Sequence, residues 1–193
     1  REEPLFPPYV HSAIWVSEAL GVVDSNNQPV TQLFGSAGNP FGGPVPVTQS
    51  LILGPAVSNE WVSFTLGQEA IFGFGNAVAT DNVFVAVLAN GAGETGTLFG
   101  RDQATNPWVS LGTIFEPLVG GITDPPNVQM FSLVNVGLSQ VNQLKIVSNS
   151  SGGSFQGLDV AGLGAISPVP IPAAFLLFGS GLAGIAILRR AKK

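Results

Sequence analysis

The chain has 193 residues, enough for one domain of ordinary size with an appendage, and only 10% of them are charged. Soluble domains carry roughly 25% charged residues, so this surface must consist of Ser, Thr, Asn, Gln and Gly, and long amphipathic helices are not expected. The absence of cysteine excludes disulfides and thiolate chemistry. Three basic and 12 acidic residues precede Pro168, and the resulting charge of −9 argues against binding to nucleic acid.

Residues 1–55 are expected to form an irregular segment, rich in Pro and Gly, that packs on the rest of the domain. They contain eight of the 15 prolines, and proline removes a backbone donor that regular structure needs. The stretch 11–23 fits the helical and the strand period poorly, so a strand and a short helix both stay open. The sequence starts at Arg1 without Met, from which we expect an amino-terminal signal peptide to have been removed or omitted.

Residues 56–167 contain short runs rich in β-branched and aromatic side chains, bounded by Gly, Asn, Asp or Pro. The spacing of these runs predicts an all-β domain, an antiparallel β-sandwich of jelly-roll type. Residues 83–88 are almost entirely apolar and are predicted to form the central buried strand. Trp61 and Trp108 lie within strand patterns and are predicted to belong to the core. The predicted strands are 60–66, 70–74, 82–88, 108–114, 128–134, 143–148 and 158–166.

The order of segments in this domain carries a resemblance. FTLGQEAIFGFGNAVATDNVFVAVLANG is followed by WVSLGTI and then by LSQVNQLKIVSNSSGGSFQGLDVAGLGAI. The order is similar to that of β-sandwich ectodomains found with C-terminal sorting tails, and it implies a discoidin-like, galactose-binding-type jelly roll over residues 60–166. Asp159 is followed by Val160 and Ala161, where those ectodomains carry a second Asp.

Candidates for chemistry are few. His11 is the single histidine and no Gly-x-Ser-x-Gly motif is present, so we expect no enzyme and no organic cofactor. Calcium is the most plausible ion, because Asp and Asn oxygens are the hard ligands that this chain offers. Its candidate ligands are Asp81 and Asn82, before the predicted central strand, and Asp159. The alternative is that these side chains fix turns.

The C-terminal region has the pattern of a membrane anchor. Residues 171–188 carry no charge, and as a helix they would extend about 27 Å, close to the thickness of a bilayer core. Basic residues follow at once, and by the positive-inside rule they place the C-terminus in the cytoplasm and the acidic domain outside it. The cytoplasmic anchor consists of Arg189, Arg190, Lys192 and Lys193.

A proline motif before this span carries a second resemblance. It is followed by Phe-Gly-Ser-Gly-Leu at 178–182 and by two arginines, and the whole looks like the PEP-CTERM sorting signal of Gram-negative bacteria, in its Val-Pro-x-Pro-Ala-Ala variant. The resemblance implies recognition by exosortase, a membrane protease-transpeptidase, with removal of the helix and release or transfer of the outer domain. The motif consists of Val169, Pro170, Ile171, Pro172, Ala173 and Ala174, with Ile171 at the usual Glu position.

Small residues in the span are spaced to let another helix approach closely in lipid. They suit docking onto the protease or a partner helix, although Gly and Ala are also common in membrane helices, and both interpretations stay open. The residues concerned are Gly179, Ser180, Gly181, Ala183 and Gly184.

Three segments result: 1–55, the sandwich 56–167, and 168–193 with the sorting signal. We expect an exported structural or adhesive protein of the cell envelope or extracellular matrix, anchored in the inner membrane and processed by exosortase, with its acidic domain periplasmic or extracellular. One alternative is a glycan-binding surface module whose partner is a surface polysaccharide. Another is a single-pass subunit of a membrane complex that retains the helix in lipid.

Overall fold

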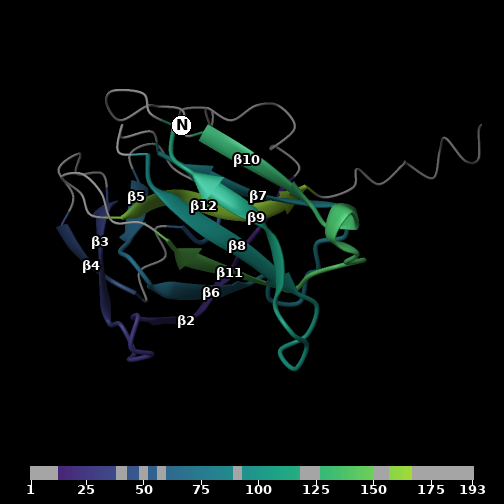
Figure 1. The fold of residues 1–193 in the computed structure, drawn as a ribbon, viewed down its shortest axis with the longest axis horizontal. Helices are drawn as coiled ribbons and strands as arrows, with labels where there is room; N and C mark the ends of the chain where they lie inside the picture. Colours follow the sequence, from purple (N-terminus) through teal and green to yellow (C-terminus); the bar gives the residue numbers. More distant parts are fainter. Residues whose placement is uncertain are drawn as a thin grey trace, which may run out of the picture.

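The computed structural model describes residues 13–37, 43–47, 52–55, 60–88, 93–117, 127–149 and 157–166. This part of the chain is all-β, with its strands in two antiparallel sheets (Figure 1). No helix within these ranges is long and apolar enough to cross a bilayer. The predicted span 171–188 lies outside the described residues, as do the sorting motif, the helix-packing residues and the basic anchor.

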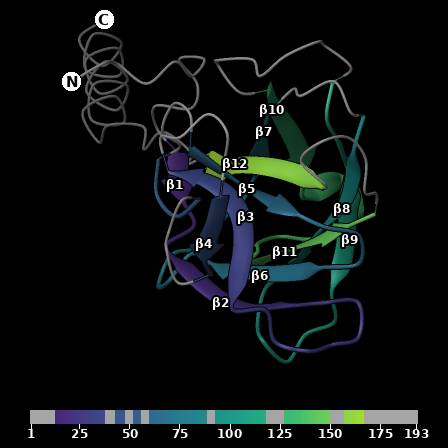
Figure 2. The same cartoon turned by 90° about the vertical axis from the view of Figure 1, so that its left-hand side faces the viewer.

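Sheet A has seven strands in the order β10-β7-β12-β5-β3-β4, with β1 paired to β12. Sheet B has five strands in the order β2-β6-β11-β8-β9. Figure 2 shows the two sheets as layers, with β12 and β5 of sheet A above β6 and β11 of sheet B. In sheet A the strands are β1 (Ala13–Trp15), β3 (Gln32–Ala37), β4 (Gly43–Pro46), β5 (Glu60–Phe64), β7 (Asn82–Val87), β10 (Asn127–Ser132) and β12 (Leu158–Ile166). In sheet B they are β2 (Glu18–Val23), β6 (Glu69–Gly73), β8 (Thr95–Arg101), β9 (Val109–Phe115) and β11 (Gln143–Ser148), and the short 3-10 helix η2 (Val134–Val136) follows β10.

The main core lies between the sheets. Alternation decides which side chains enter it, because successive residues of a strand point to opposite faces. In β11, for example, Leu144 and Ile146 are fully buried, whereas Lys145 between them is only partly covered. The largest fully buried apolar side chains of this core are Phe64, Leu98, Ile114, Leu133, Leu144, Ile146, Leu158 and Leu163.

Strand β7 is buried on both of its faces, as predicted, but it is second from an edge of sheet A and not its central strand. It lies between β10 and β12, and its residues from Val83 to Val87 are 0% exposed. Val83, Val85 and Val87 face the main core, while Ala86 belongs to a second apolar cluster on the other face of sheet A. Trp61 is part of this second cluster, at 2% exposure, so its predicted place in the core is confirmed.

The N-terminal segment differs from the prediction. Strands β1 to β4 fall within 13–46 and pair with β12, β6 and β5 as integral parts of both sheets. The prolines that suggested irregular chain are tolerated because β4, which contains Pro44 and Pro46, is an edge strand, where a missing N–H breaks no ladder. The stretch 13–23 forms two strands, which decides between the two conformations that the sequence left open.

A side chain caps one free edge of the sandwich. The side-chain amide of Gln129, on β10, accepts a hydrogen bond from the Phe115 N–H (3.1 Å) and donates one to the Phe115 carbonyl. Gln129 therefore takes the place of a neighbouring strand at the end of β9, the edge of sheet B.

Candidate functional site

The outward face of sheet B is where the described part of the chain gathers polar and aromatic side chains. Burial alternates strictly along β8 and β11, so Thr97, Phe99 and Arg101 point away from the core, as do Gln143 and Lys145. The register places Lys145 opposite Phe99 and Gln143 opposite Arg101. These five side chains therefore lie side by side on two neighbouring strands, β11 and β8, of one sheet.

Two cations and two aromatic rings meet on this face, and we name them the aromatic–cation cluster: Phe99, Arg101, Trp108 and Lys145. The Arg101 guanidinium carbon lies 4.1 Å from the centroid of the Trp108 ring. Lys145 Nζ lies 5.0 Å from the Phe99 centroid and 5.4 Å from the Trp108 centroid. All three distances are within the range of cation–π attraction.

Hydrogen bonds fix the long side chains around the cluster. Arg101 Nε donates to Gln143 Oε1 at 2.7 Å, and Lys145 Nζ donates to Glu69 Oε2 at 3.0 Å in an ion pair. Each of these bonds joins neighbouring strands, so the arrangement is held by the sheet itself rather than by loops. A rigid platform of this kind loses little conformational entropy on binding a ligand.

Trp108 was predicted to be a core residue, and this prediction is wrong. The ring lies just before β9 and is only partly buried, with Arg101 against it instead of core side chains. The predicted strand 108–114 is displaced by one residue from β9, which begins at Val109. The physical reason is a β-bulge in β9: Leu98 pairs with Gly112 but Phe99 pairs with Ser110, so the alternation that leads back from the buried Ile114 is reversed before Leu111. Trp108 therefore lies on the outer face, where regular alternation would have turned it inward.

The comparisons with known proteins show a distant similarity of structure only. No family model matches the chain, and no curated protein matches its sequence. The structure is similar to the CBM32 of AlyQ in complex with 4,5-unsaturated mannuronic acid, at 13% identity and a TM-score of 0.45, over 77% of this chain and 95% of that one.

Two further solved structures are similar at the same level. The C-terminal domain of a chitobiase from Bacteroides fragilis has 13% identity and a TM-score of 0.47, over 81% of this chain and 97% of that one. A pectin-binding carbohydrate-binding module has 8% identity and a TM-score of 0.42, over 58% of this chain and 75% of that one.

A second polar group is buried where β8 begins and β9 ends, beside the start of β12. The side chains of Glu94, Glu116 and Asp159 are only 1%, 1% and 2% exposed. Glu94 Oε1 accepts a hydrogen bond from the Gly157 N–H at 2.8 Å, and Glu116 Oε1 accepts one from the Asp159 N–H. We name these three residues the carboxyl cluster. The two hydrogen bonds join one end of sheet B to the start of β12 in sheet A.

Glu116 of the carboxyl cluster favours its protonated form. Burial raises the pKa of Glu116 from 4.5 to about 9; the N–H of Asp159 lowers it, whereas the nearby carboxyl groups of Asp159 and Glu94 and a side-chain hydrogen bond with Glu94 raise it further. Protonated Glu116 is thus the form present at neutral pH, and it donates where a carboxylate would repel. With exposures of 1–2%, the three groups are out of reach of a substrate, and their role is structural.

The three candidate calcium ligands are not brought together. Asp81 and Asn82 lie at the start of β7, where Asn82 pairs with Ser132. Asp159 lies beside the other end of that strand, where its carbonyl accepts the Leu88 N–H at 3.1 Å. Six residues of strand separate the two ends, about 20 Å. Among the described residues no group of three acids or histidines is placed to hold a metal ion.

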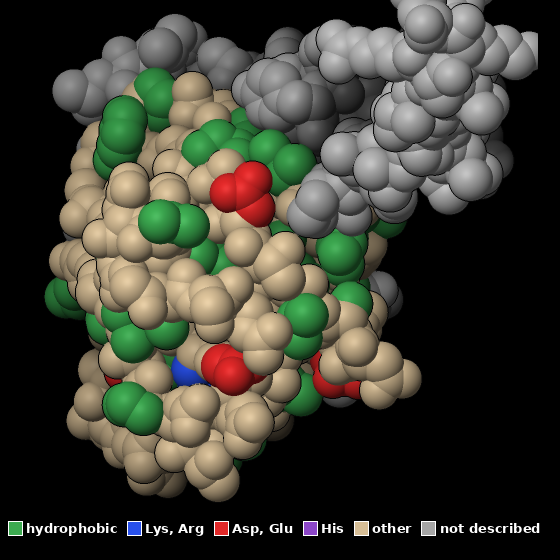
Figure 3. All heavy atoms as spheres, turned by 90° about the vertical axis from the view of Figure 1, so that its right-hand side faces the viewer, with side chains coloured by type: hydrophobic (Ala, Val, Ile, Leu, Met, Phe, Trp, Pro, Cys, Tyr) green, Lys and Arg blue, Asp and Glu red, His purple; other side chains and the backbone are tan. Residues whose placement is uncertain are grey.

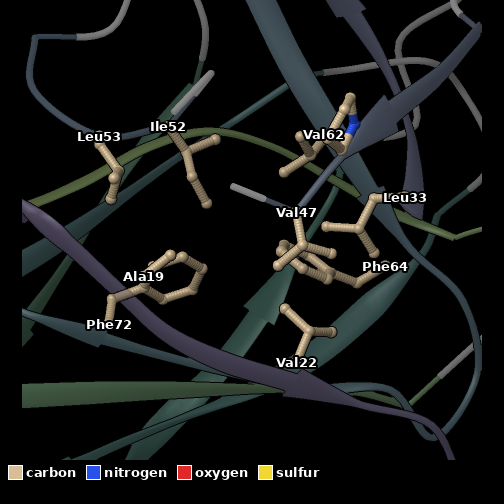
Figure 4. A pocket seen from close by; sticks show the side chains of 10 residues that line it. Ala19, Val22, Leu33, Val47, Ile52, Leu53, Val62, Phe64 and Phe72 are labelled. Carbon is tan, nitrogen blue, oxygen red and sulfur yellow. The ribbon is translucent and has the colours of Figure 1, made fainter. Parts of the chain in front are cut away.

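A recess between the sheets is lined by apolar side chains (Figure 4). Phe64, Phe72 and Ile52 point into it, and its volume of ≈ 10 Å³ is about enough for one water molecule. It is too small for a sugar ring. The surface beyond the sheets agrees with the composition, because the face drawn in Figure 3 shows few charged side chains among backbone and uncharged polar atoms.

Sequence reasoning missed Arg101 and Lys145 as functional residues. The sequence signal that could have found them is the small number of basic residues. Only three precede Pro168, and two of these lie on paired strands of one sheet. Their convergence also requires that Thr95–Arg101 be recognised as a strand, and this strand was not predicted.

Proposed function

We propose that this protein is a non-catalytic glycan-binding module and that it binds sugar on the outward face of sheet B. The aromatic–cation cluster is the observation that carries the proposal. It favours the glycan-binding alternative over a purely structural or adhesive role, because a rigid, ligand-sized set of rings and hydrogen-bonding groups is more than a sheet surface needs to stay soluble.

The residue types of this face match the chemistry of sugars. A pyranose ring offers a flat face of C–H groups, which packs against aromatic rings such as Trp108 and Phe99. Its hydroxyls both donate and accept, and Gln143, Thr97 and Asn149 supply both kinds of partner. The Asn149 amide already donates to the Thr97 hydroxyl at 2.7 Å, so these two groups are preset at the edge of the platform.

A sheet face rather than a closed pocket suits an extended polymer. The outward polar residues continue along β9 as Ser110 and Thr113, both of which are exposed. A chain of several sugar units that lies across β11, β8 and β9 would contact rings and polar groups in turn. We therefore propose a polysaccharide, as part of a matrix or cell surface, rather than a free monosaccharide.

The wider setting is a proposal that the sequence supports. The charge-free residues 171–188 and the basic residues after them favour export of the sandwich and anchoring in the inner membrane, with recognition of the Val169–Ala174 motif by exosortase. The segment order of residues 60–166 supports a discoidin-like jelly roll. A retained helix in a membrane complex is the competing interpretation of the same tail.

A glycan array tests the proposed function. We expect the full chain to bind a restricted set of polysaccharides and Trp108→Ala to lose that binding, because the variant removes the ring on which Arg101 stacks. Trp15→Ala is the matched control, since Trp15 is a partly buried aromatic residue on the other sheet, with its ring 5.0 Å from Phe84. Absence of binding to every glycan, or equal binding by both variants, contradicts the proposal.

Mass measurement of the protein from its native membrane tests the tail separately. Loss of about 20 C-terminal residues, the length of one span, is expected when exosortase is present and not in a strain that lacks it. An intact tail in a stable complex in both strains contradicts the sorting proposal and favours the membrane subunit.

A further inference from the structure

We infer that the sugar recognised on sheet B is acidic, carrying a carboxylate or sulfate group that the aromatic–cation cluster binds through Arg101 and Lys145. The inference rests on the proposed glycan-binding function and adds the chemical class of its ligand. The observation behind it is where this acidic protein places its positive charge.

Positive charge is concentrated at this one point. The chain before Pro168 has three basic residues against 12 acidic ones. Two of the three, Arg101 and Lys145, have their charged groups 4.1 Å and 5.4 Å from the same Trp108 ring. They are the basic residues of the described ranges, so the rest of the described surface offers an anion no ionic partner.

Arg101 is prepared to bind an anion. Its guanidinium is stacked on Trp108 and its Nε is held by Gln143, which fixes the plane of the group. Within the described residues it forms no ion pair, and its two terminal amino groups donate no hydrogen bond. A fixed guanidinium with two parallel donors matches the two oxygens of a carboxylate or sulfate.

Lys145 adds a second positive charge, which Glu69 partly neutralises. The Lys145–Glu69 pair at 3.0 Å leaves this lysine side chain 14% exposed and the glutamate 39% exposed. With Arg101, these three groups sum to a local charge of +1 inside a body of net negative charge. The ion pair also positions the ammonium between the two rings, close enough to Trp108 to act on a ligand that lies over it.

Selectivity also follows from the surroundings. An acidic body repels acidic polymers at long range, so only a ligand that places its anionic group against Arg101 gains from binding. Salt weakens attraction between exposed charges, and the interaction with an acidic sugar must therefore weaken as salt rises, whereas binding of a neutral sugar by stacking must change little.

Two matched polymer pairs test the inference with the full chain. One pair is polygalacturonate and its carboxyl-reduced, neutral form; the other is dextran sulfate and dextran. We expect binding to an acidic member at least tenfold tighter than to its neutral partner, and weaker at high salt. Arg101→Gln should lower the affinity for the acidic polymer roughly tenfold. Arg101→Lys keeps the charge but loses the two parallel donors of the guanidinium, and its affinity should lie between those of wild type and Arg101→Gln.

A variant that is expected to strengthen binding serves as a control, because a variant that fails to fold can only lose affinity. Glu69→Gln removes the acid that neutralises Lys145, and we expect it to tighten binding to the acidic polymer about twofold to fivefold. Asp81→Asn makes the same charge change at an exposed position just before β7 of sheet A and should leave the affinity unaltered. Equal gains from the two variants would show a general charge effect and overturn the inference.

The remaining outcomes are distinct. Equal binding to the acidic and neutral members of both pairs overturns the acidic class and leaves glycan binding in place. Binding to none of the four polymers also overturns the inference, while the glycan array decides the proposed function on its own. Acid-selective binding that survives Arg101→Gln unchanged assigns the anion to another surface and overturns the proposal for this cluster.

Discussion

Replacement of Glu116 by glutamine should remove most of the pH dependence of stability from this domain. The glutamine side chain has the shape of a protonated glutamate: its oxygen still accepts from the Asp159 N–H, and its amide donates to Glu94 as the carboxyl proton does. Its charge state, however, does not change with pH. The variant therefore isolates the energetic effect of the Glu116 proton.

The size of the effect follows from the two pKa values of Glu116, 4.5 as its ordinary value and about 9 in the folded protein. Between these values the folded protein binds one more proton than the unfolded chain, so stability falls as pH rises. Each pH unit lowers the free energy of unfolding by about 1.4 kcal/mol, and the interval from pH 5 to pH 8 by about 4 kcal/mol at most. Below 4.5 both states hold the proton, and this contribution is fully present.

Urea unfolding followed by tryptophan fluorescence at pH 5, 6, 7 and 8 measures this difference. We expect wild type to lose stability across the series, Glu116→Gln to stay nearly level, and the two to be close at pH 5. Asp81→Asn, which removes an exposed acid outside the carboxyl cluster, should follow wild type. Parallel profiles for wild type and Glu116→Gln would refute the reasoning, because the buried group would then hold no extra proton.

Two further predictions concern packing and the sheet edge. Gly35 and Gly43 are paired across β3 and β4, but a Cβ on Gly35 would lie 2.5 Å from the Trp61 carbonyl, whereas a Cβ on Gly43 meets nothing within 4 Å. Gly35→Ala should therefore lower the free energy of unfolding in urea by about 1–3 kcal/mol, and Gly43→Ala should change it little. Equal effects of the two substitutions would contradict this. Gln129→Ala should destabilise the fold by about 1 kcal/mol and speed hydrogen exchange at the Phe115 amide, since both backbone groups of Phe115 lose their partner. An unchanged exchange rate at Phe115 would contradict the role of Gln129 in capping this edge.

Sequence alone predicts those strands in which the pattern of apolar and polar residues matches the pattern of buried and exposed positions. β11 and β12 occur at the predicted residues, and β7 ends one residue early, because clear alternation or a continuous apolar run leaves little choice. β8 was missed because its inward positions include Gly96 and Gly100, which suggest turns in a sequence. In the structure a Cβ at Gly96 would lie 2.7 Å from Leu158 and one at Gly100 2.8 Å from Val141, so glycine is there to let the core close.

The candidate site depends on pairings that a single sequence does not reveal. Glu94 and Glu116 are 22 positions apart and become neighbours only through the β8–β9 hairpin, in which Thr95 pairs with Phe115. The same missed strand hides the meeting of Arg101 with Lys145. Residue types thus indicated what chemistry was available, whereas the register of three adjacent strands determined where it gathers.

The pairing of β1 with β12 has a consequence for engineering. Ala13 and Ile166 are partners in register, so the described fold begins and ends at points about 5 Å apart. Both lie on sheet A, the layer opposite the outward face of sheet B. The domain is therefore suited to insertion into a surface turn of a host protein, or to circular permutation through a short bridge, with the outward face of sheet B left untouched.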